Sequence, residues 1–387
     1  MRPFFLSFLA MLNRRTLRIK IMQSLFAYEQ CKDADYLLAL DYIDVFFQPD
    51  LNSMKVQDKV LLKGQRPVAI KQFEKQFKGE PIKESADPRI NQAVEEALAL
   101  HTKQLKNDFD YFRKMTVIES EKISTYYFSA LNLIPAFASL ASNDKKLSAK
   151  NFSANPLVLS LIENPNLKKE TSKTGSAWDH RMEIVRGWFR DCIKPDKEFQ
   201  GYLKQSSPNL DDHKAFAKHL VRKLILGNTI INSYFEEEDQ RWAEDHEIVR
   251  SMVDKTLKSY NEETKAIEIQ KLSLDWEEDK EFIDKLFIGS IRLNKSYHDL
   301  IAENTKNWEV DRLPLTDQVI LHMAIVEMID FPNIPVKVTI NEYIELAKQY
   351  STPKSRQFIN GILDVIAKEL RRAGKIKKSG RGLMDNK

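Results

Sequence analysis

The sequence predicts an all-α protein, built as a compact helical bundle into which a further helical region is inserted. Apolar residues recur every three or four positions over long stretches, which is the spacing of one face of a helix. No stretch shows the regular alternation of apolar and polar residues that a half-buried strand requires. The chain of 387 residues contains only 11 glycines, which argues against an α/β enzyme rich in phosphate-binding loops.

Composition limits the compartment and the partners that we expect. The net charge is only +4, so any nucleic-acid site must arise from local clustering of basic residues. Cys31 and Cys192 are far apart and form no CxxC pair, which fits the reducing cytoplasm and neither a disulfide framework nor a zinc site. No segment holds the roughly 18 uninterrupted apolar residues of a membrane span, so we expect none.

Residues 1–12 are interpreted as a leader. One arginine precedes an apolar run, as in a short signal sequence, but the run is at the lower limit of length and shows no small-x-small cleavage site. The segment that follows, NRRTLRIK, is strongly basic and has the wrong polarity for export. We therefore expect a start-site extension or a disordered leader, with Met11 as the biological start.

Residues 13–47 are expected to form the first helices of the core. Their apolar stripe comprises Leu17, Ile21, Leu25 and Tyr28. Arg14, Arg15 and Arg18 cluster at the beginning of this helix, where cations oppose the helix dipole. The cluster indicates either a polyanion partner, because guanidinium groups suit phosphates, or a solvated basic face.

Residues 48–175 are interpreted as an inserted helical and linker region. The stretch 48–87 is polar and basic with several prolines and glycines, and we expect one short helix there. Residues 88–140 return to a helical pattern, in which His101 lies on an apolar face and is expected to be a core or boundary residue rather than a ligand. Residues 141–174 are rich in Ser, Asn and Lys, which is typical of a linker, and we expect one short helix there, around Leu157–Ile162.

Residues 176–275 contain a weak internal repeat of helices that pack on the core. Trp178 and Trp242 are each followed five residues later by Glu-Ile-Val, and Trp276 is followed likewise by Glu-Phe-Ile. The unequal spacing of the tryptophans argues against a solenoid, so we expect similar helical hairpins in one bundle.

Residues 276–372 are expected to complete the core, and their last two helices carry clear start signals. Thr339 and Glu342 have the spacing of a capping box, which predicts a helix start at Thr339. Thr352 followed by proline predicts the start of the next helix. Asn360-Gly361 lies inside that second helix, where glycine costs about 1 kcal/mol relative to alanine. Tight helix packing and the close approach of a ligand both explain such a glycine.

The basic residues 373–387 are expected to form a flexible tail, either solvated or serving as a diffuse phosphate-binding extension. Enzyme motifs are absent from the sequence: we find no P-loop, no GxGxxG, no HExxH, no GxSxG and no spaced Cys/His set. The sequence therefore predicts no catalytic residue, no cofactor and no metal site.

Several stretches share the pattern of a known family. Four lie near the C-terminus: RLPLTDQVILHMAIVEM, Ile334-Pro335, INEYIELAKQY and FINGILD. Two more are LNRRTLRIKIMQSLFAYEQ and EFIDKLFIGSIRLNKSYHDLI. Together they resemble the NusB family of transcription antitermination factors. The resemblance covers residues 13–30 and 276–370, which would make this chain a long form with a large internal insertion.

The resemblance implies a compact all-helical RNA-binding protein. The family binds the boxA element of ribosomal RNA leader transcripts together with the small-subunit ribosomal protein that doubles as NusE, in an antitermination complex with RNA polymerase. The RNA-facing residues carried over by position are Arg14, Arg15, Arg18, Lys354, Ser355, Arg356, Phe358 and Asn360. Phe358 would stack on a base or belong to the core. Phe26 and Asp317 match positions near the NusE contact, and Gly361 is expected to serve close packing of the two terminal helices.

Two alternatives to an antitermination factor remain open at this stage. One is a protein of ribosomal RNA modification, because NusB-like domains also occur fused to ribosomal RNA methyltransferases. This alternative would require a downstream nucleotide-cofactor domain, and no glycine-rich loop occurs up to Lys387. The other is a helical scaffold in which the insertion has replaced RNA binding.

Overall fold

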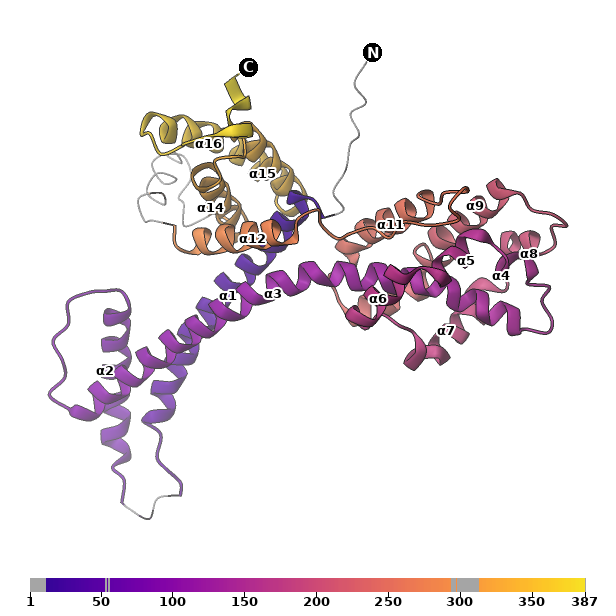
Figure 1. The fold of residues 1–387 in the computed structure, drawn as a ribbon. Coiled ribbons are helices and arrows are strands. Elements are labelled where there is room, and N and C mark those ends of the chain that lie inside the picture. The colour runs from indigo at the N-terminus through magenta and orange to yellow at the C-terminus, as the bar shows by residue number, and fades with distance from the viewer. Residues whose placement is uncertain (1–11, 53, 55, 294–296, 298–312, 387) are drawn as a thin grey trace. The chain divides into compact units, whose positions relative to one another are not determined.

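A computed structural model describes residues 12–52, 54, 56–293, 297 and 313–386 of the chain (Figure 1). Its α-helices are α1 (Arg14–Phe46), α2 (Lys59–Phe77), α3 (Pro88–Asn143), α4 (Lys150–Ser153), α5 (Pro156–Glu163), α6 (Pro165–Thr174), α7 (Met182–Trp188), α8 (Lys197–Leu203), α9 (Leu210–His219), α10 (Thr229–Glu238), α11 (Trp242–Lys258), α12 (Trp276–Ile291), α14 (Leu315–Asp330), α15 (Val336–Tyr350) and α16 (Pro353–Arg372). Short 3₁₀ or π-helical turns are η1 (Asp179–Arg181), η2 (Phe189–Ile193), η3 (Leu220–Ile225) and η5 (Gly380–Asn386).

The prediction of an all-α fold is confirmed. Within the described ranges no β-strand is present, and an isolated bridge pairs Asn261 with Ala266. Among the helices described, none combines the length and the apolar character that crossing a membrane requires. The predicted leader falls outside the described residues except for Leu12, and so does most of the stretch RLNKSYHDLI that contributes to the family resemblance.

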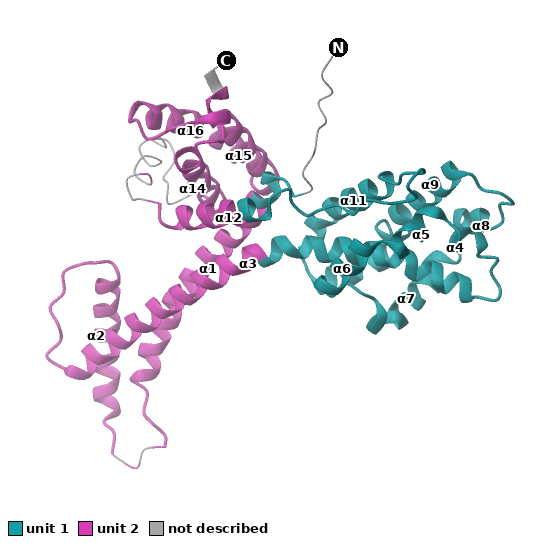
Figure 2. Ribbon diagram, viewed as in Figure 1, with its two compact units in different colours: residues 1–17, 118–279 teal, residues 18–117, 280–387 magenta. Residues whose placement is uncertain are grey.

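The chain divides into two compact units (Figure 2). The described residues of unit 1 fall within 1–17 and 118–279, and those of unit 2 within 18–117 and 280–387. The region that the sequence predicts as one insertion, 48–175, is therefore divided between the two units.

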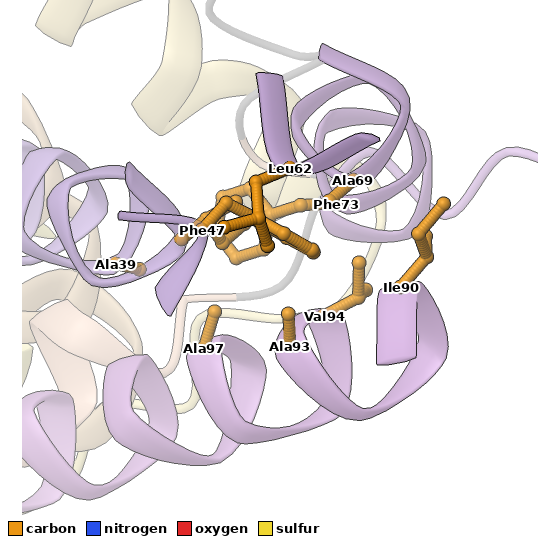
Figure 3. Packing of buried hydrophobic residues seen from close by; sticks show 10 residues of the cluster. Ala39, Phe47, Leu62, Ala69, Phe73, Ile90, Ala93, Val94 and Ala97 are labelled. Carbon is orange, nitrogen blue, oxygen red and sulfur yellow. The ribbon is translucent and has the colours of Figure 1, made fainter. Parts of the chain in front are cut away.

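In unit 2, α1 and the first part of α3 lie side by side, and α2 packs against their ends (Figure 1). A cluster of buried residues joins the three helices (Figure 3), and its members are Ala39, Ile43, Phe47, Leu62, Ala69, Phe73, Ile90, Ala93, Val94 and Ala97. Small alanines face the larger rings, which lets the helix backbones approach closely. The buried ring of His101 packs edge-on against Phe77 at 5.1 Å, so its assignment to the core is confirmed.

The two stretches predicted as mostly linker contain more helix than expected, because prolines counted as helix breakers lie inside or at the start of helices. The short helix expected around Leu157–Ile162 is confirmed as α5. In the stretch 48–87, α2 runs for 19 residues with Pro67 inside it, capped by the Asp58 carboxylate. In the predicted linker 141–174, α4 precedes two helices that each begin with an Asn-Pro pair. The side chains of Asn155 and Asn164 accept hydrogen bonds from backbone N–H groups of the first turn, while proline occupies the first helical position.

In unit 1, aromatic residues form the centre of the packing between α3, α7, α10 and α11. Trp178 and Trp242 are 6% and 1% exposed, and both contact Phe235. Trp242 begins α11 and Trp276 begins α12, as the repeat predicts, whereas Trp178 lies before the short turn η1. The tryptophans thus mark helix starts in two of three cases.

In unit 2, α14, α15 and α16 pack on one another and hold the C-terminal core. The predicted start of α16 is confirmed, because the Thr352 side chain accepts a hydrogen bond from the Ser355 N–H at 3.2 Å. The predicted start of α15 at Thr339 was wrong: the helix begins at Val336 after Pro335. Thr339 lies within the helix, where its hydroxyl donates to Glu327 at 2.9 Å instead of capping.

The tail was predicted to be flexible, but its middle part is held against the loop after α14. The Ser379 N–H donates to the Pro332 carbonyl at 3.1 Å, and the Lys378 ammonium donates to the Phe331 carbonyl at 2.9 Å. A Cβ added at Gly382 would lie 1.9 Å from the Pro332 carbonyl oxygen, so only glycine allows this approach. The prediction of a flexible tail was therefore wrong over residues 378–382.

Candidate nucleic-acid interface

The start of α16 presents exposed polar and basic side chains. The helix is strongly amphipathic, and its buried side is formed by Ile359, Ile362, Leu363, Ile366, Ala367 and Leu370. Lys354, Arg356 and Asn360 point away from that side and are exposed. Neither cation has an ion-pair partner among the described residues, so both charges are available to a phosphate. We call these three residues the α16 patch.

Two further residues predicted in this patch are placed differently from the exposed three. Ser355 is buried, and its hydroxyl lies 2.9 Å from the Thr352 hydroxyl within the helix cap. The prediction that Ser355 contacts RNA was therefore wrong, because the residue closes the first turn of α16. Phe358 is half-buried, and its role in base stacking stays a prediction.

Gly361 was predicted to serve close packing of the terminal helices, and the structure contradicts this. It is exposed, and an added Cβ would meet no atom within 4 Å. The glycine leaves a smooth, open turn on the outer side of α16, one residue after Asn360. Close approach of a ligand is the explanation of this glycine that stays compatible with the geometry.

The arginine cluster at the start of α1 does not form one exposed basic face. Arg15 is exposed. The Arg14 guanidinium lies 2.6 Å from a carboxylate oxygen of Glu278 and 3.4 Å from one of Asp279, at the start of α12. These acids neutralise Arg14 and tie the beginning of α1 to the beginning of α12 within unit 1.

Arg18 was predicted to face RNA, but it is only 2% exposed. Its guanidinium donates two hydrogen bonds to the carboxylate of Glu327 on α14, at 2.7 and 2.8 Å. A carboxylate oxygen of Glu342 on α15 lies 3.6 Å away. The prediction was wrong because the arginine balances a buried acid, and it would have to leave that pair in order to touch a phosphate.

Glu327 is the centre of this buried network, and sequence reasoning missed it. Its side chain is 0% exposed and also accepts hydrogen bonds from Thr339 at 2.9 Å and Tyr343 at 3.1 Å. Burial raises the pKa of the Tyr343 phenol, and the adjacent Glu327 charge raises it further, so the phenol remains a donor. The available signal was a single acid within the apolar run VILHMAIVEM, which demands a buried cation elsewhere in the chain.

Of the two residues predicted near a protein partner, one is exposed and one is not. Phe26 on α1 is 38% exposed, a large amount for a phenylalanine, and its partner role stays a prediction. Asp317 in the first turn of α14 is 1% exposed and accepts a hydrogen bond from the Ser351 hydroxyl. Its prediction as a partner contact was wrong, because the carboxylate joins α14 to the turn between α15 and α16.

No cluster of metal-ligating side chains occurs in the parts of the chain that the structure describes. Among those residues, no group of three or more His, Cys, Asp or Glu side chains is arranged to hold a metal ion. The candidate site therefore consists of exposed basic and amide side chains on the surface of a helical bundle, and the core of that bundle contains the Arg18–Glu327 ion pair.

Together these features define an all-α bundle protein with a basic surface at the start of its last helix. The sequence model of the NusB family matches residues 244–368, which contain α12, α14 and α15 and most of α11 and α16. Three relatives, each named transcription antitermination protein NusB, carry the comparison further. No solved structure matches the chain.

The relative from Bacillus licheniformis is 38% identical over 103 residues, which are 27% of this chain and 80% of that protein. The relative from Chloroherpeton thalassium is 38% identical over 140 residues, 36% of this chain and 63% of that protein. The relative from Salinibacter ruber is 37% identical over 105 residues, 27% of this chain and 66% of that protein. The chain thus spans just under two thirds of the latter two relatives. It belongs to the NusB family.

Proposed function

We propose that the chain is a cytoplasmic, non-enzymatic transcription antitermination factor that binds boxA-like single-stranded RNA together with a NusE-type small-subunit ribosomal protein. In this role it joins an antitermination complex with RNA polymerase during ribosomal RNA synthesis. The observation that carries the proposal is membership of the NusB family, whose similar members are named transcription antitermination protein NusB.

The α16 patch supplies the chemistry that RNA binding requires. Lys354 and Arg356 provide two unneutralised cations within the first turn of one helix, and Asn360 provides an amide one turn further on. An amide both donates and accepts hydrogen bonds, so it can read the edge of an unpaired base, while the cations hold the backbone. The open surface at Gly361 lets a nucleotide come close to the helix.

Arg15 and Phe358 complete the proposed RNA contacts of the core. Arg15 is the exposed member of the arginine cluster, and Phe358 is half-buried beside the α16 patch. Stacking of one base on an aromatic side chain contributes about 1–3 kcal/mol. Arg14, Arg18, Ser355 and Asp317 are left out because their side chains are used within the fold.

The proposal is tested by titrating a fluorescent boxA-like RNA with the full chain, with and without the NusE-type protein. Lys354→Gln with Arg356→Gln should weaken binding and lower the slope of log K against log salt by about 1.4, because each contact to a single-strand phosphate contributes about 0.7. The matched control is Lys63→Gln with Lys71→Gln, which removes the same charge from exposed positions of α2 in the same unit. Equal slopes for both double variants would contradict the assignment of the patch.

The partner surface is tested separately. Phe26→Ala should weaken binding of the NusE-type protein, because an aromatic ring that is 38% exposed can be covered by a partner. Leu38→Ala, at a position 47% exposed on the same helix, is the control. If both variants bind the NusE-type protein as the wild type does, Phe26 is not part of the interface.

One set of observations favours a second function, a helical scaffold without RNA binding. Two of the three arginines that the family resemblance places against RNA are neutralised by carboxylates of the chain itself. In that case the chain would bind no boxA-like RNA at low salt, while it still bound the NusE-type protein. The titration above therefore separates the two functions.

A further inference from the structure

A groove crosses unit 1, apart from the surfaces considered so far. It has a volume of about 700 Å³, within the usual range of ligand sites. One wall is the α3 segment from Ile118 to Phe128, the second is α6, and the third is the connector of residues 269–273 with Trp276 at the start of α12. All of these elements belong to unit 1.

The groove is lined by four lysines and two glutamates, and the lysines stand on more than one wall. They are Lys122, Lys169, Lys173, Lys271, Glu121 and Glu170. The Lys122 ammonium is occupied by Glu119 and Asp239, each at 3.0 Å. Lys169 and Lys271 are exposed and have no ion-pair partner among the described residues, whereas the Lys173 ammonium lies 3.9 Å from a carboxylate oxygen of Glu170 and its side chain is 74% exposed. The charge available to a ligand is therefore positive.

The spacing of these lysines suits an extended anion better than a single phosphate group. Lys169 and Lys173 are separated by one turn of α6, so their side chains lie next to each other along the helix. Lys271 comes from the connector on another wall. Cations placed along a groove and across it follow a polyanionic backbone, as in proteins that bind single-stranded nucleic acids.

An aromatic ring stands at the same groove. Trp276 is partly exposed, and its indole N–H donates to a carboxylate oxygen of Glu121 at 2.8 Å. This hydrogen bond fixes the orientation of the ring while part of its surface remains open. A fixed aromatic ring beside lysines is the arrangement on which unpaired bases stack.

The groove also adjoins the arginine cluster within unit 1. The Leu12 N–H donates to the carbonyl of Leu272, a residue that lines the groove, at 3.0 Å. Arg14 pairs with Glu278, two residues after Trp276. The segment that carries the exposed Arg15 is thus held at the edge of the groove.

We propose that this groove is a second RNA-binding site, which holds a single-stranded segment through Lys169, Lys173 and Lys271 and stacks one base on Trp276. The inference rests on the proposed function for the identity of the polyanion as RNA. Because lysines contact phosphates and every base has a stacking face, the groove adds affinity without sequence preference. It gives the inserted helices of unit 1 a role in holding RNA.

The test uses the full chain and two RNAs of equal length, one boxA-like and one an unstructured oligouridine. Lys169→Gln with Lys271→Gln should lower the salt slope for both RNAs by about 1.4. The matched control is Lys145→Gln with Lys146→Gln, at exposed positions of unit 1 outside the groove. Trp276→Ala should weaken binding of both RNAs severalfold, and Trp276→Phe should restore most of it. Both variants lose the hydrogen bond to Glu121, so a purely structural effect would weaken binding equally in both.

The outcomes separate the groove from the proposed function. If the groove variants match their control while Lys354→Gln with Arg356→Gln weakens boxA binding, the groove inference is overturned and the proposed function stands. If the chain shows no preference for boxA-like RNA but the groove variants lose oligouridine binding, the groove stands and the proposed function fails. Absence of binding to either RNA at low salt overturns both.

Discussion

The buried pair of Arg18 and Glu327 makes the sharpest prediction about stability. Arg18→Ala leaves the Glu327 carboxylate inside unit 2 with Thr339 and Tyr343 as its hydrogen-bond donors among the described residues. Two charge-assisted hydrogen bonds of 2.7 and 2.8 Å are lost together with the balancing charge. Tyr343 also loses the guanidinium that lies 5.8 Å from its ring centre.

Removing one partner of such a buried pair typically costs about 3–5 kcal/mol, because the remaining charge is left uncompensated. Arg18 is 2% exposed and the Glu327 side chain 0%, so water cannot replace the lost partner. A domain has a total stability of about 5–15 kcal/mol, so Arg18→Ala should remove a large part of the stability of unit 2. Arg18→Met with Glu327→Leu should cost much less, because no charge remains.

Urea unfolding with two probes measures this effect unit by unit. In a Trp308→Phe background the remaining tryptophans are Trp178, Trp188, Trp242 and Trp276, all in unit 1. Their fluorescence then reports on unit 1, whereas circular dichroism at 222 nm reports on both units. Arg18→Ala should shift a circular-dichroism transition to lower urea and leave the fluorescence transition in place.

A small effect would refute the reasoning. If Arg18→Ala costs less than about 1 kcal/mol, the value of an exposed ion pair, Arg18 is not buried against Glu327 in solution. If the double variant costs as much as the single one, the cost arises from lost packing rather than from an uncompensated charge.

Three further predictions concern single residues. Gly361→Ala should raise stability by about 1 kcal/mol in urea unfolding, because the site is exposed, helical and free of neighbours within 4 Å; a loss of stability would mean that the site is covered. In Gly382→Ala the added methyl group collides with the Pro332 carbonyl, so the tail should be released. Trypsin should then cleave at Lys378 and Arg381 at least tenfold faster, with little change elsewhere. Unchanged cleavage would refute the contact between the tail and the loop after α14. Asp35 is buried with an unpartnered oxygen among the described residues, and burial, then the charge of Asp108, raises its pKa. The Asp35 carboxyl therefore loses its proton at lower pH in the unfolded state than in the folded state. Because of this, the stability of the folded state falls as pH rises above the ordinary aspartate pKa of about 4. Asp35→Asn should accordingly raise the melting temperature at about pH 7 but not at about pH 3.

The sequence predicted most helices because their signals are local. The apolar spacing in α1 and the Thr-Pro start of α16 depend on neighbouring residues only, and both predictions hold. Pro165 misled the prediction because proline after an asparagine cap starts a helix, as it does in α6. Pro67 misled it differently: α2 continues through this proline, although an interior proline removes one hydrogen bond of the helix. The predicted helix start at Thr339 failed because the capping pattern is local, whereas the Thr339 hydroxyl donates its hydrogen bond to Glu327 on another helix.

The candidate site was harder to predict, since exposure is set by contacts between distant segments. Arg18 and Glu327 are 309 residues apart in sequence, and no local pattern pairs them. By contrast, Lys354 and Arg356 lie in the first turn of an amphipathic helix, where exposure follows from the position of the apolar side. The family resemblance supplied both sets of residues, and local periodicity indicates exposure for those of the α16 patch but not for the arginine cluster.

Under the proposed function, Arg14 and Arg18 would contribute to RNA binding through the fold. Arg14 joins α1 to the start of α12, and Arg18 joins α1 to α14, so each holds a helix on which other residues are presented. The opposition between these cations and the helix dipole, which suggested a polyanion partner, is relieved by carboxylates within the chain. A loss of RNA affinity in Arg18→Ala would thus follow the loss of folded unit 2, whereas a loss in Lys354→Gln with Arg356→Gln would occur in a fully folded chain. RNA binding of both variants, measured at a urea concentration far below the unfolding transition of unit 2, distinguishes these two causes.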